Sequence, residues 1–230
     1  MQRIGRRRAG RGLRPRAAGT LLACALGATP AQAATLGATV RDEGREPVAD
    51  AVVYAVPLDA PAPAPPDYPE TIEIDQIDKE FVPHVTAVRV GTRVSFPNRD
   101  QIRHHVYSFS EAKTFEIPLY KGVPAEPVTF GRDGEVALGC NIHDWMKAYV
   151  FVSETPWFDV TGPDGRAALE LPAGAYRLQV WHPRLRGTPA ETARRVEVPE
   201  GVAPEIEFAI AQKRVWRARR APSRADPGYR

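Results

Sequence analysis

Three residues with metal-binding side chains lie in one short segment, 139–146, which reads Gly-Cys-Asn-Ile-His-Asp-Trp-Met. Cys140, His143 and Met146 follow one another with the spacing Cys-x2-His-x2-Met. A loop of this length can direct one thiolate, one imidazole and one thioether at a common point. Thiolate, two imidazoles and a weak thioether are the donor set of a blue-copper centre, whereas zinc usually takes further cysteines or histidines and no thioether. The segment therefore predicts a copper site that needs one more histidine.

A further histidine is available upstream, in the segment 98–107, which reads Asn-Arg-Asp-Gln-Ile-Arg-His-His-Val-Tyr. His104 and His105 stand at the start of a predicted strand, and we expect His104 rather than His105 to be the ligand. The two remaining histidines, His84 and His182, each lie beside a proline and are expected to be ordinary surface residues.

The sulfur residues support a metal site. The chain has two cysteines and two methionines. Cys24 and Met1 fall in a segment that we expect to be removed on export, which would leave Cys140 and Met146 as the only sulfur residues. An unpaired thiol in an oxidising compartment is unusual, and metal binding would account for it.

On these two motifs, the region from about 70 to 154 resembles the cupredoxins, the family of plastocyanin, and within them amicyanin of the methylamine-utilisation type. The family's first ligand lies in a His-Asn-Val step after an Asn-x-Asp turn, which 98–106 matches except that His105 replaces the asparagine. Its other ligands lie in a Cys-x2-His-x2-Met loop that leads into a strand, as in 140–152. The paired opening strands of the family are matched by 81–83 and 88–96.

The resemblance implies a Greek-key β-sandwich that holds one type 1 copper ion per chain. Its ligands would be His104, Cys140, His143 and Met146. In this family the thiolate couples the metal electronically and the methionine is a weak axial ligand that biases the reduction potential.

Other residues would act around the metal or at its outer edge. Asn98 and His105 would support the ligand segments, and the backbone N–H of Ile142 would point at the cysteine sulfur. Asp144 and Trp145 would contribute to partner docking, although Trp145 could instead cap the metal loop. Asp144 replaces a proline of amicyanin, and His105 could compete for the metal.

The rest of the chain has an all-β pattern, without a long run of helical periodicity. Turn residues such as Asp133-Gly134 separate short β-branched or alternating runs. The predicted strands are 38–41, 51–56, 71–74, 85–90, 93–96, 105–109, 127–130, 135–138, 149–152, 166–171, 175–181, 195–198 and 205–210.

Two flanking segments resemble the halves of a carboxypeptidase regulatory-like sandwich: 40–54 its opening, and 161–178 its second half. A proline-rich linker, 57–66, follows the first segment. We therefore expect the cupredoxin domain, 67–154, to be inserted into a second small β-sandwich made of 34–66 and 155–212. The alternative is that 34–66 is an edge hairpin of the copper domain.

The two ends are basic. Seven arginines precede an apolar run, 17–28, and the small-x-small sequence Ala31-Gln32-Ala33, so 1–33 reads as a signal peptide. A lipoprotein processed at Cys24 is a minor alternative. The tail, 213–230, holds seven more basic residues and reads as disordered. The body, 34–212, carries 17 basic and 27 acidic residues. This acidic balance argues against a nucleic-acid binder, and no apolar run is long enough for a transmembrane segment.

These observations predict a periplasmic copper protein that carries single electrons and is not an enzyme. A copper-delivery protein is the alternative, although such proteins often display several exchangeable thioethers or histidines. The resemblance to amicyanin implies a dehydrogenase or a c-type cytochrome as the redox partner.

Overall fold

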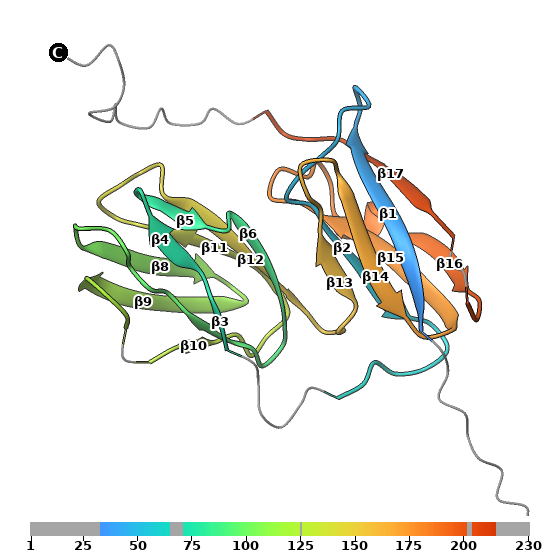
Figure 1. Cartoon of the computed structure of the whole chain (residues 1–230), viewed down its shortest axis with the longest axis horizontal. Coiled ribbons are helices and arrows are strands. Elements are labelled where there is room, and N and C mark those ends of the chain that lie inside the picture. The colour runs from blue at the N-terminus through green and yellow to red at the C-terminus, as the bar shows by residue number, and fades with distance from the viewer. Residues whose placement is uncertain (1–32, 65–70, 125, 202–203, 215–230) are drawn as a thin grey trace, which may run out of the picture. The chain divides into compact units, whose positions relative to one another are not determined.

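The strands belong to two β-sandwiches in a computed structural model that describes residues 33–64, 71–124, 126–201 and 204–214 (Figure 1). Apart from one 3-10 turn, Pro189–Thr192, all regular structure in these ranges is β. The all-β prediction is therefore confirmed. Among the described residues no helix has the length and apolar character needed to cross a membrane.

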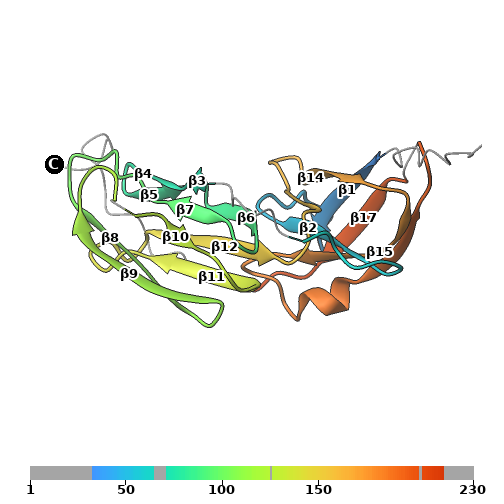
Figure 2. The same cartoon turned by 90° about the horizontal axis from the view of Figure 1, so that it is seen from below.

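The first sandwich, called here the inserted sandwich, comprises strands β3 to β12. One layer is a five-stranded sheet in the order β6-β12-β11-β8-β9, and the other contains the sheets β10-β7-β3 and β4-β5 (Figure 2). The strands are β3 (Thr71–Glu73), β4 (Asp75–Ile77), β5 (Glu80–Val82), β6 (Val85–Arg89), β7 (Arg93–Ser95), β8 (His104–Ser110), β9 (Lys113–Tyr120), β10 (Val128–Thr129), β11 (Gly134–Gly139) and β12 (Lys147–Ser153).

The core of the inserted sandwich follows from the alternation along its strands. Val136 and Leu138 of β11 point inward with Val150 of β12, while the residues between them face the other side of the sheet. Cys140 and Met146 belong to this same buried cluster. The two sulfur residues are thus packed into the apolar core at one end of the sheet.

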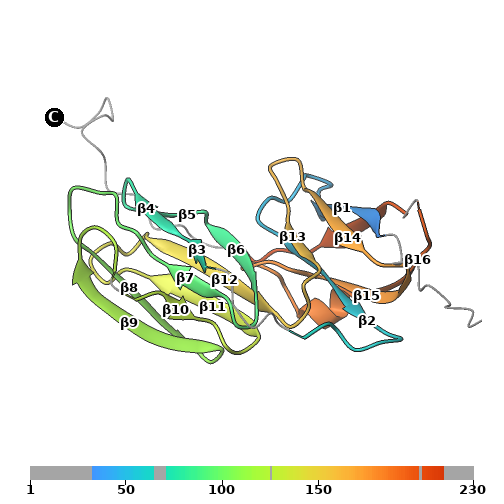
Figure 3. The same ribbon diagram turned by 60° about the horizontal axis from the view of Figure 1, so that its bottom comes forward.

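The second sandwich, called here the outer sandwich, is built from the two ends of the described chain. Its layers are the sheets β14-β1-β17 and β13-β2-β15-β16 (Figure 3). The strands are β1 (Ala34–Asp42), β2 (Val52–Pro57), β13 (Phe158–Val160), β14 (Arg166–Leu171), β15 (Gly174–Trp181), β16 (Arg194–Val198) and β17 (Ile206–Ile210).

The pairing of β1 and β2 settles how the two sandwiches are connected. Strand β1 pairs antiparallel with β14 and parallel with β17, and β2 pairs antiparallel with β13 and β15. The chain therefore begins the outer sandwich, makes the whole inserted sandwich, and then completes the outer one. Among the described residues, neither β1 nor β2 pairs with a strand of the inserted sandwich. The boundaries expected for the inserted domain, 67–154, stay a prediction.

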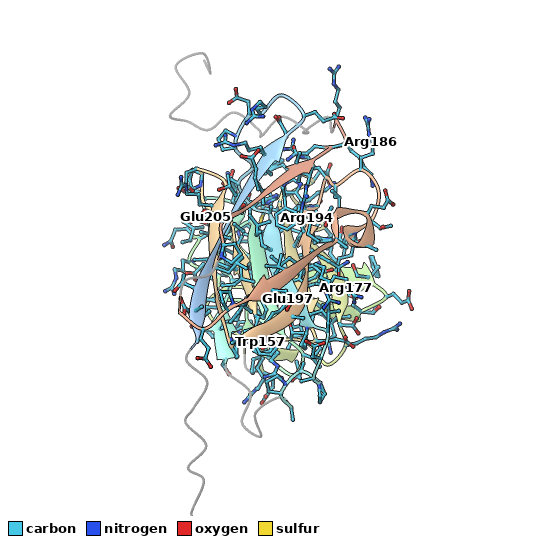
Figure 4. The ribbon with its side chains drawn as sticks, turned by 90° about the vertical axis from the view of Figure 1, so that its right-hand side faces the viewer. Trp157, Arg177, Arg186, Arg194, Glu197 and Glu205 are labelled. Atoms are coloured by element: carbon cyan, nitrogen blue, oxygen red, sulfur yellow. The ribbon has the colours of Figure 1, made fainter. Side chains whose placement is uncertain are left out.

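Apolar residues of both layers fill the outer sandwich, among them Leu36, Leu178 and Phe208. Arg194 is on β16 (Figure 4). Its guanidinium carbon lies 5.6 Å from the centre of the Phe208 ring. Trp157 packs against this core and meets the ring of Tyr176 edge-on at 5.5 Å.

One histidine of the outer sandwich differs from its expected location. His182, directly after β15, is only 5% exposed, and its Nδ1 accepts a hydrogen bond from the backbone N–H of Arg184 at 3.1 Å. The expectation of a surface residue is therefore wrong for His182. His84 is exposed, as expected.

Candidate metal centre

Three neighbouring strands bring the candidate ligands together. His104 is the first residue of β8, Cys140 directly follows β11, and His143 lies in the loop 140–146 between β11 and β12. Gly139 pairs with Lys147 across β11 and β12, so this loop starts and ends at adjacent points of one sheet. Gly139 also pairs with Tyr107 of β8, which places the start of β8 beside the loop.

The donor atoms of His104, Cys140 and His143 all lie within 4.8 Å of one another. The Cys140 Sγ is 3.7 Å from His143 Nδ1, and the centres of the two imidazole rings are 4.9 Å apart. His104 is 0% exposed and Cys140 is 3% exposed, whereas His143 is partly exposed. Of the described residues, these are the three that form a cluster able to hold a metal ion.

The orientation of the His104 ring fits a metal ligand. Its Nε2 lies 2.7 Å from Oδ2 of Asp100. An ionised carboxylate only accepts hydrogen bonds, so Nε2 carries the proton and Nδ1 keeps a lone pair. That Nδ1 is buried and has no hydrogen-bond partner. A buried acceptor without a partner is costly, and a metal ion at the cluster would satisfy it.

The electrostatics of His143 also favour metal binding. Burial lowers the pKa of His143, and Coulomb interactions with His104 and Lys79 lower it further, against an opposing effect of Asp100. The ring therefore remains neutral, with a free lone pair, at lower pH than an ordinary histidine does.

Met146 lies at the end of the same loop. It is 1% exposed, belongs to the same buried cluster as Cys140, and its backbone N–H donates to the carbonyl of His143 at 2.9 Å. This hydrogen bond closes the loop, which fixes the backbone at Met146 relative to His143.

The side chain of His105 contacts Glu116 instead of the three-residue cluster. Its Nε2 lies 2.8 Å from Oε1 of Glu116 on β9, and it is not part of the three-residue cluster. His104 is thus the histidine of this pair that the structure brings to Cys140 and His143.

Asn98 supports the segment that leads to His104. Its side-chain amide donates to the carbonyls of Ile102 and Tyr120 at 2.9 Å each, and its Oδ1 accepts the backbone N–H of Asp100 at 3.0 Å. These bonds shape the loop that ends at His104.

The remaining predicted residues lie in the ligand loop. Ile142 is 48% exposed and Asp144 is exposed. Trp145 is half-buried, packs against the core of the inserted sandwich, and lies with its ring centre 5.2 Å from that of His143. Its indole N–H donates to the carbonyl of Lys79 at 3.2 Å. These contacts favour a cap over the metal loop for Trp145.

The sequence did not identify Asp100 as a partner of His104, nor the turn at Asp78 and Lys79 as part of the site. Asp100 belongs to the Asn-x-Asp turn and stands four residues before His104. This spacing could have indicated a carboxylate–histidine pair. The turn is far away in sequence and has no such signal.

Comparisons with known proteins place this geometry in context. No protein family and no curated protein matches the sequence. Among solved structures, a reduced Cu(I) form of an amicyanin variant at pH 4 is 24% identical, covering 36% of this chain and 82% of the amicyanin, with a TM-score of 0.34. A second amicyanin variant, also reduced, is 24% identical over 44% of this chain and 99% of its own length, with the same TM-score.

A copper-containing nitrite reductase from Thermus scotoductus is 28% identical, with a TM-score of 0.34. The match covers 43% of this chain and 25% of the reductase. The chain thus spans about a quarter of that protein.

Proposed function

We propose that this chain is a type 1 copper protein that carries single electrons. The observation that supports this most strongly is the convergence of the donor atoms of His104, Cys140 and His143 within 4.8 Å. A thiolate and two imidazoles form the trigonal donor set of blue-copper sites, and the buried thioether of Met146 would be the weak fourth donor. Copper bound there would supply a one-electron Cu(II)/Cu(I) couple.

The protein would keep the copper-binding side chains in fixed positions. His104 is fixed through Asp100, and the ligand loop is closed between two paired strands. Side chains that cannot rearrange would keep the ligand geometry similar in both oxidation states. Burial of His104 and Cys140 would exclude water, and the partly exposed edge of His143 would be the route to a partner.

We further propose that the protein works in the periplasm, exported through the signal peptide at 1–33, of which 1–32 lie outside the described residues. Its partner would be another redox protein, either a dehydrogenase or a c-type cytochrome. The acidic balance of 34–212 suits a basic docking surface on that partner. The outer sandwich would serve as an interaction or scaffold module.

The decisive experiment is the visible and paramagnetic-resonance spectrum of the copper-loaded protein. An intense blue band, lost in Cys140→Ser and in His104→Ala but retained in His105→Ala, is the expected result. Weak absorption with rapid loss of copper to a chelator would favour copper delivery. Retention of the blue band without the Cys140 thiol would overturn the proposal.

A second experiment tests the assigned partner class. Reduced protein is mixed with an oxidised c-type cytochrome in a stopped-flow instrument, at low and high salt. Electron transfer that slows as salt increases is expected, and a charge-reversed variant in the outer sandwich, Glu197→Lys, should alter the rate without changing the blue band. Bleaching by that variant would contradict the role assigned to the outer sandwich.

A further inference from the structure

The two-residue turn between β4 and β5 has an unusual backbone. Asp78 and Lys79 have φ angles of 52° and 60°, in the left-handed region that glycine or asparagine usually occupies. For other residues this conformation costs about 1–2 kcal/mol each. Such a turn persists only where its surroundings hold it in place.

Asp100 is the group that holds this turn. Its Oδ1 accepts the backbone N–H of Asp78 at 2.7 Å, and its Oδ2 accepts that of Lys79 at 2.8 Å. The same Oδ2 accepts the Nε2–H of His104 at 2.7 Å. One carboxylate therefore joins the turn to the first candidate ligand.

The other candidate ligands are tied to the same turn from the opposite direction. The carbonyl of Lys79 accepts the indole N–H of Trp145 at 3.2 Å. Trp145 stands between His143 and Met146 in the ligand loop, and its ring packs against both the core and the His143 ring. Lys79 thus uses its N–H toward the segment of His104 and its C=O toward the loop of Cys140.

We propose that the turn at Asp78 and Lys79 is a brace that holds the two ligand-bearing segments in register, with Asp100 and Trp145 as its positioning residues. This inference rests on the proposed copper function. Asp100 fixes the tautomer and rotation of His104, so that Nδ1 faces Cys140 and His143. Trp145 fixes the ligand loop against the same two residues of backbone.

The carboxylate also brings a negative charge one imidazole away from the metal position. An anion there stabilises Cu(II) more than Cu(I), because the more highly charged ion gains more Coulomb energy. Removing the charge should therefore weaken Cu(II) binding relative to Cu(I) binding by about tenfold, which raises the reduction potential by about 59 mV.

Asp100→Asn is the sharpest variant, because it retains the shape and removes the charge. An amide has one acceptor oxygen, so its NH2 group must face either the N–H of Asp78 or those of Lys79 and His104. Trp145→Phe keeps an aromatic ring but removes the indole N–H together with the five-membered ring that carries it. Matched controls in the outer sandwich are Asp164→Asn, at an exposed turn, and Tyr176→Phe, which loses a hydroxyl donor to the carbonyl of Pro172.

The copper-loaded variants are compared for reduction potential, copper hyperfine coupling and the rate of copper loss to a chelator. We expect Asp100→Asn to raise the potential as stated, and each variant to speed copper loss several-fold. Asp100→Asn and Trp145→Phe both act through the same turn, so their effects on the rate of copper loss should not be additive in the double variant. Controls should match the wild type. The proposed brace would be refuted if both variants had the reduction potential and the rate of copper loss of the wild type. It would also be refuted if their effects on copper loss were additive.

A measurement on the metal-free protein separates this inference from the copper proposal. Long-range proton–nitrogen NMR correlations report which nitrogen of His104 carries the proton. A pure Nε2–H tautomer is expected in the wild type, and a mixture in Asp100→Ala. This result would support the brace even if the wild type gave no blue band, in which case the copper function alone fails. A mixture of tautomers in the wild type would overturn the role of Asp100.

Discussion

The ring of Tyr107 on β8 lies directly over Gly139 on β11, at the residue that precedes Cys140. A Cβ atom added to Gly139 would lie 2.8 Å from Cζ and 2.9 Å from the hydroxyl oxygen of Tyr107. The absence of a side chain at Gly139 therefore lets an aromatic ring cover the backbone next to the candidate thiolate ligand.

Gly139→Ala should destabilise the protein by about 1–3 kcal/mol, because the Tyr107 ring or strand β11 must move. Chemical denaturation of the metal-free protein measures this. Gly131→Ala is the control and should be nearly neutral, since a Cβ added to Gly131 meets nothing within 4 Å and its φ is not left-handed. An equal effect of the two substitutions would contradict the close packing of Tyr107.

Met146 offers a test that separates packing from metal binding. Met146→Leu conserves volume and should cost less than about 1.5 kcal/mol, whereas Met146→Ala leaves a cavity and should cost about 2–5 kcal/mol. If the thioether is an axial ligand, Met146→Leu also changes the reduction potential of the copper-loaded protein. Denaturation and voltammetry on the same samples check both; an unchanged potential in Met146→Leu would remove Met146 from the ligand set.

Lys79→Gly should raise the free energy of unfolding by about 0.5–1 kcal/mol. Glycine adopts the φ of 60° without steric cost, and this gain exceeds the added entropy of the unfolded chain. Both backbone groups of the turn are retained, so copper should be kept as firmly as in the wild type. Lys121→Gly is the control: its φ is not left-handed, so glycine there should lower the stability.

The burial of His182 predicts that the free energy of unfolding decreases in acid. Burial lowers its pKa to about 4, with a further contribution from the charge of Arg184, against about 6.5 in the unfolded chain. The unfolded chain therefore binds more protons between these values, and stability rises with pH there. The part of the free energy of unfolding that depends on a neutral His182 is fully present above pH 6.5. It is lost as the pH falls towards 4, and amounts to about 2–3 kcal/mol.

The measurement is denaturation of the metal-free protein from pH 4 to 8. His182→Asn is the matched variant, because its side-chain oxygen can replace Nδ1 as the acceptor for the N–H of Arg184. The acid-side slope should become shallower in this variant. An unchanged slope would show that other groups cause the acid sensitivity.

The sequence led to the three residues that the structure brings together, His104, Cys140 and His143, because the metal chemistry of their side chains shows in local spacing. Cys140, His143 and Met146 are within one loop, and His104 is the first residue of a neighbouring strand. The two flanking segments were expected to pair because each resembles half of a sandwich, and in the structure β1 pairs with β14 and β2 with β15.

The edges of the sheets were harder to predict. Strand β9 lies outside the predicted strands, although its residues alternate in burial, because Pro118 interrupts a run that otherwise reads as β. Proline is tolerated there because β9 is an edge strand with one unpaired side. Strands β4 and β13, of three residues each, also lie outside the predicted strands.

The brace could not be predicted because it is made by backbone groups. An Asp-Lys pair gives no turn signal, as the usual residues are asparagine and glycine. Its conformation depends on Asp100, some twenty residues later, and on Trp145, still further along the chain. Only the fold brings these three segments together.

The threading of the chain has a consequence for biosynthesis. Ala38 of β1 pairs with Ile206 of β17, so the first of the described strands to be synthesised pairs with the last of them. The inserted sandwich draws all of its strands from between β2 and β13, and can finish while β1 and β2 still have bare edges. A chain truncated after β12 would thus carry the cluster of His104, Cys140 and His143 together with two strands whose edges are unpaired and open to association.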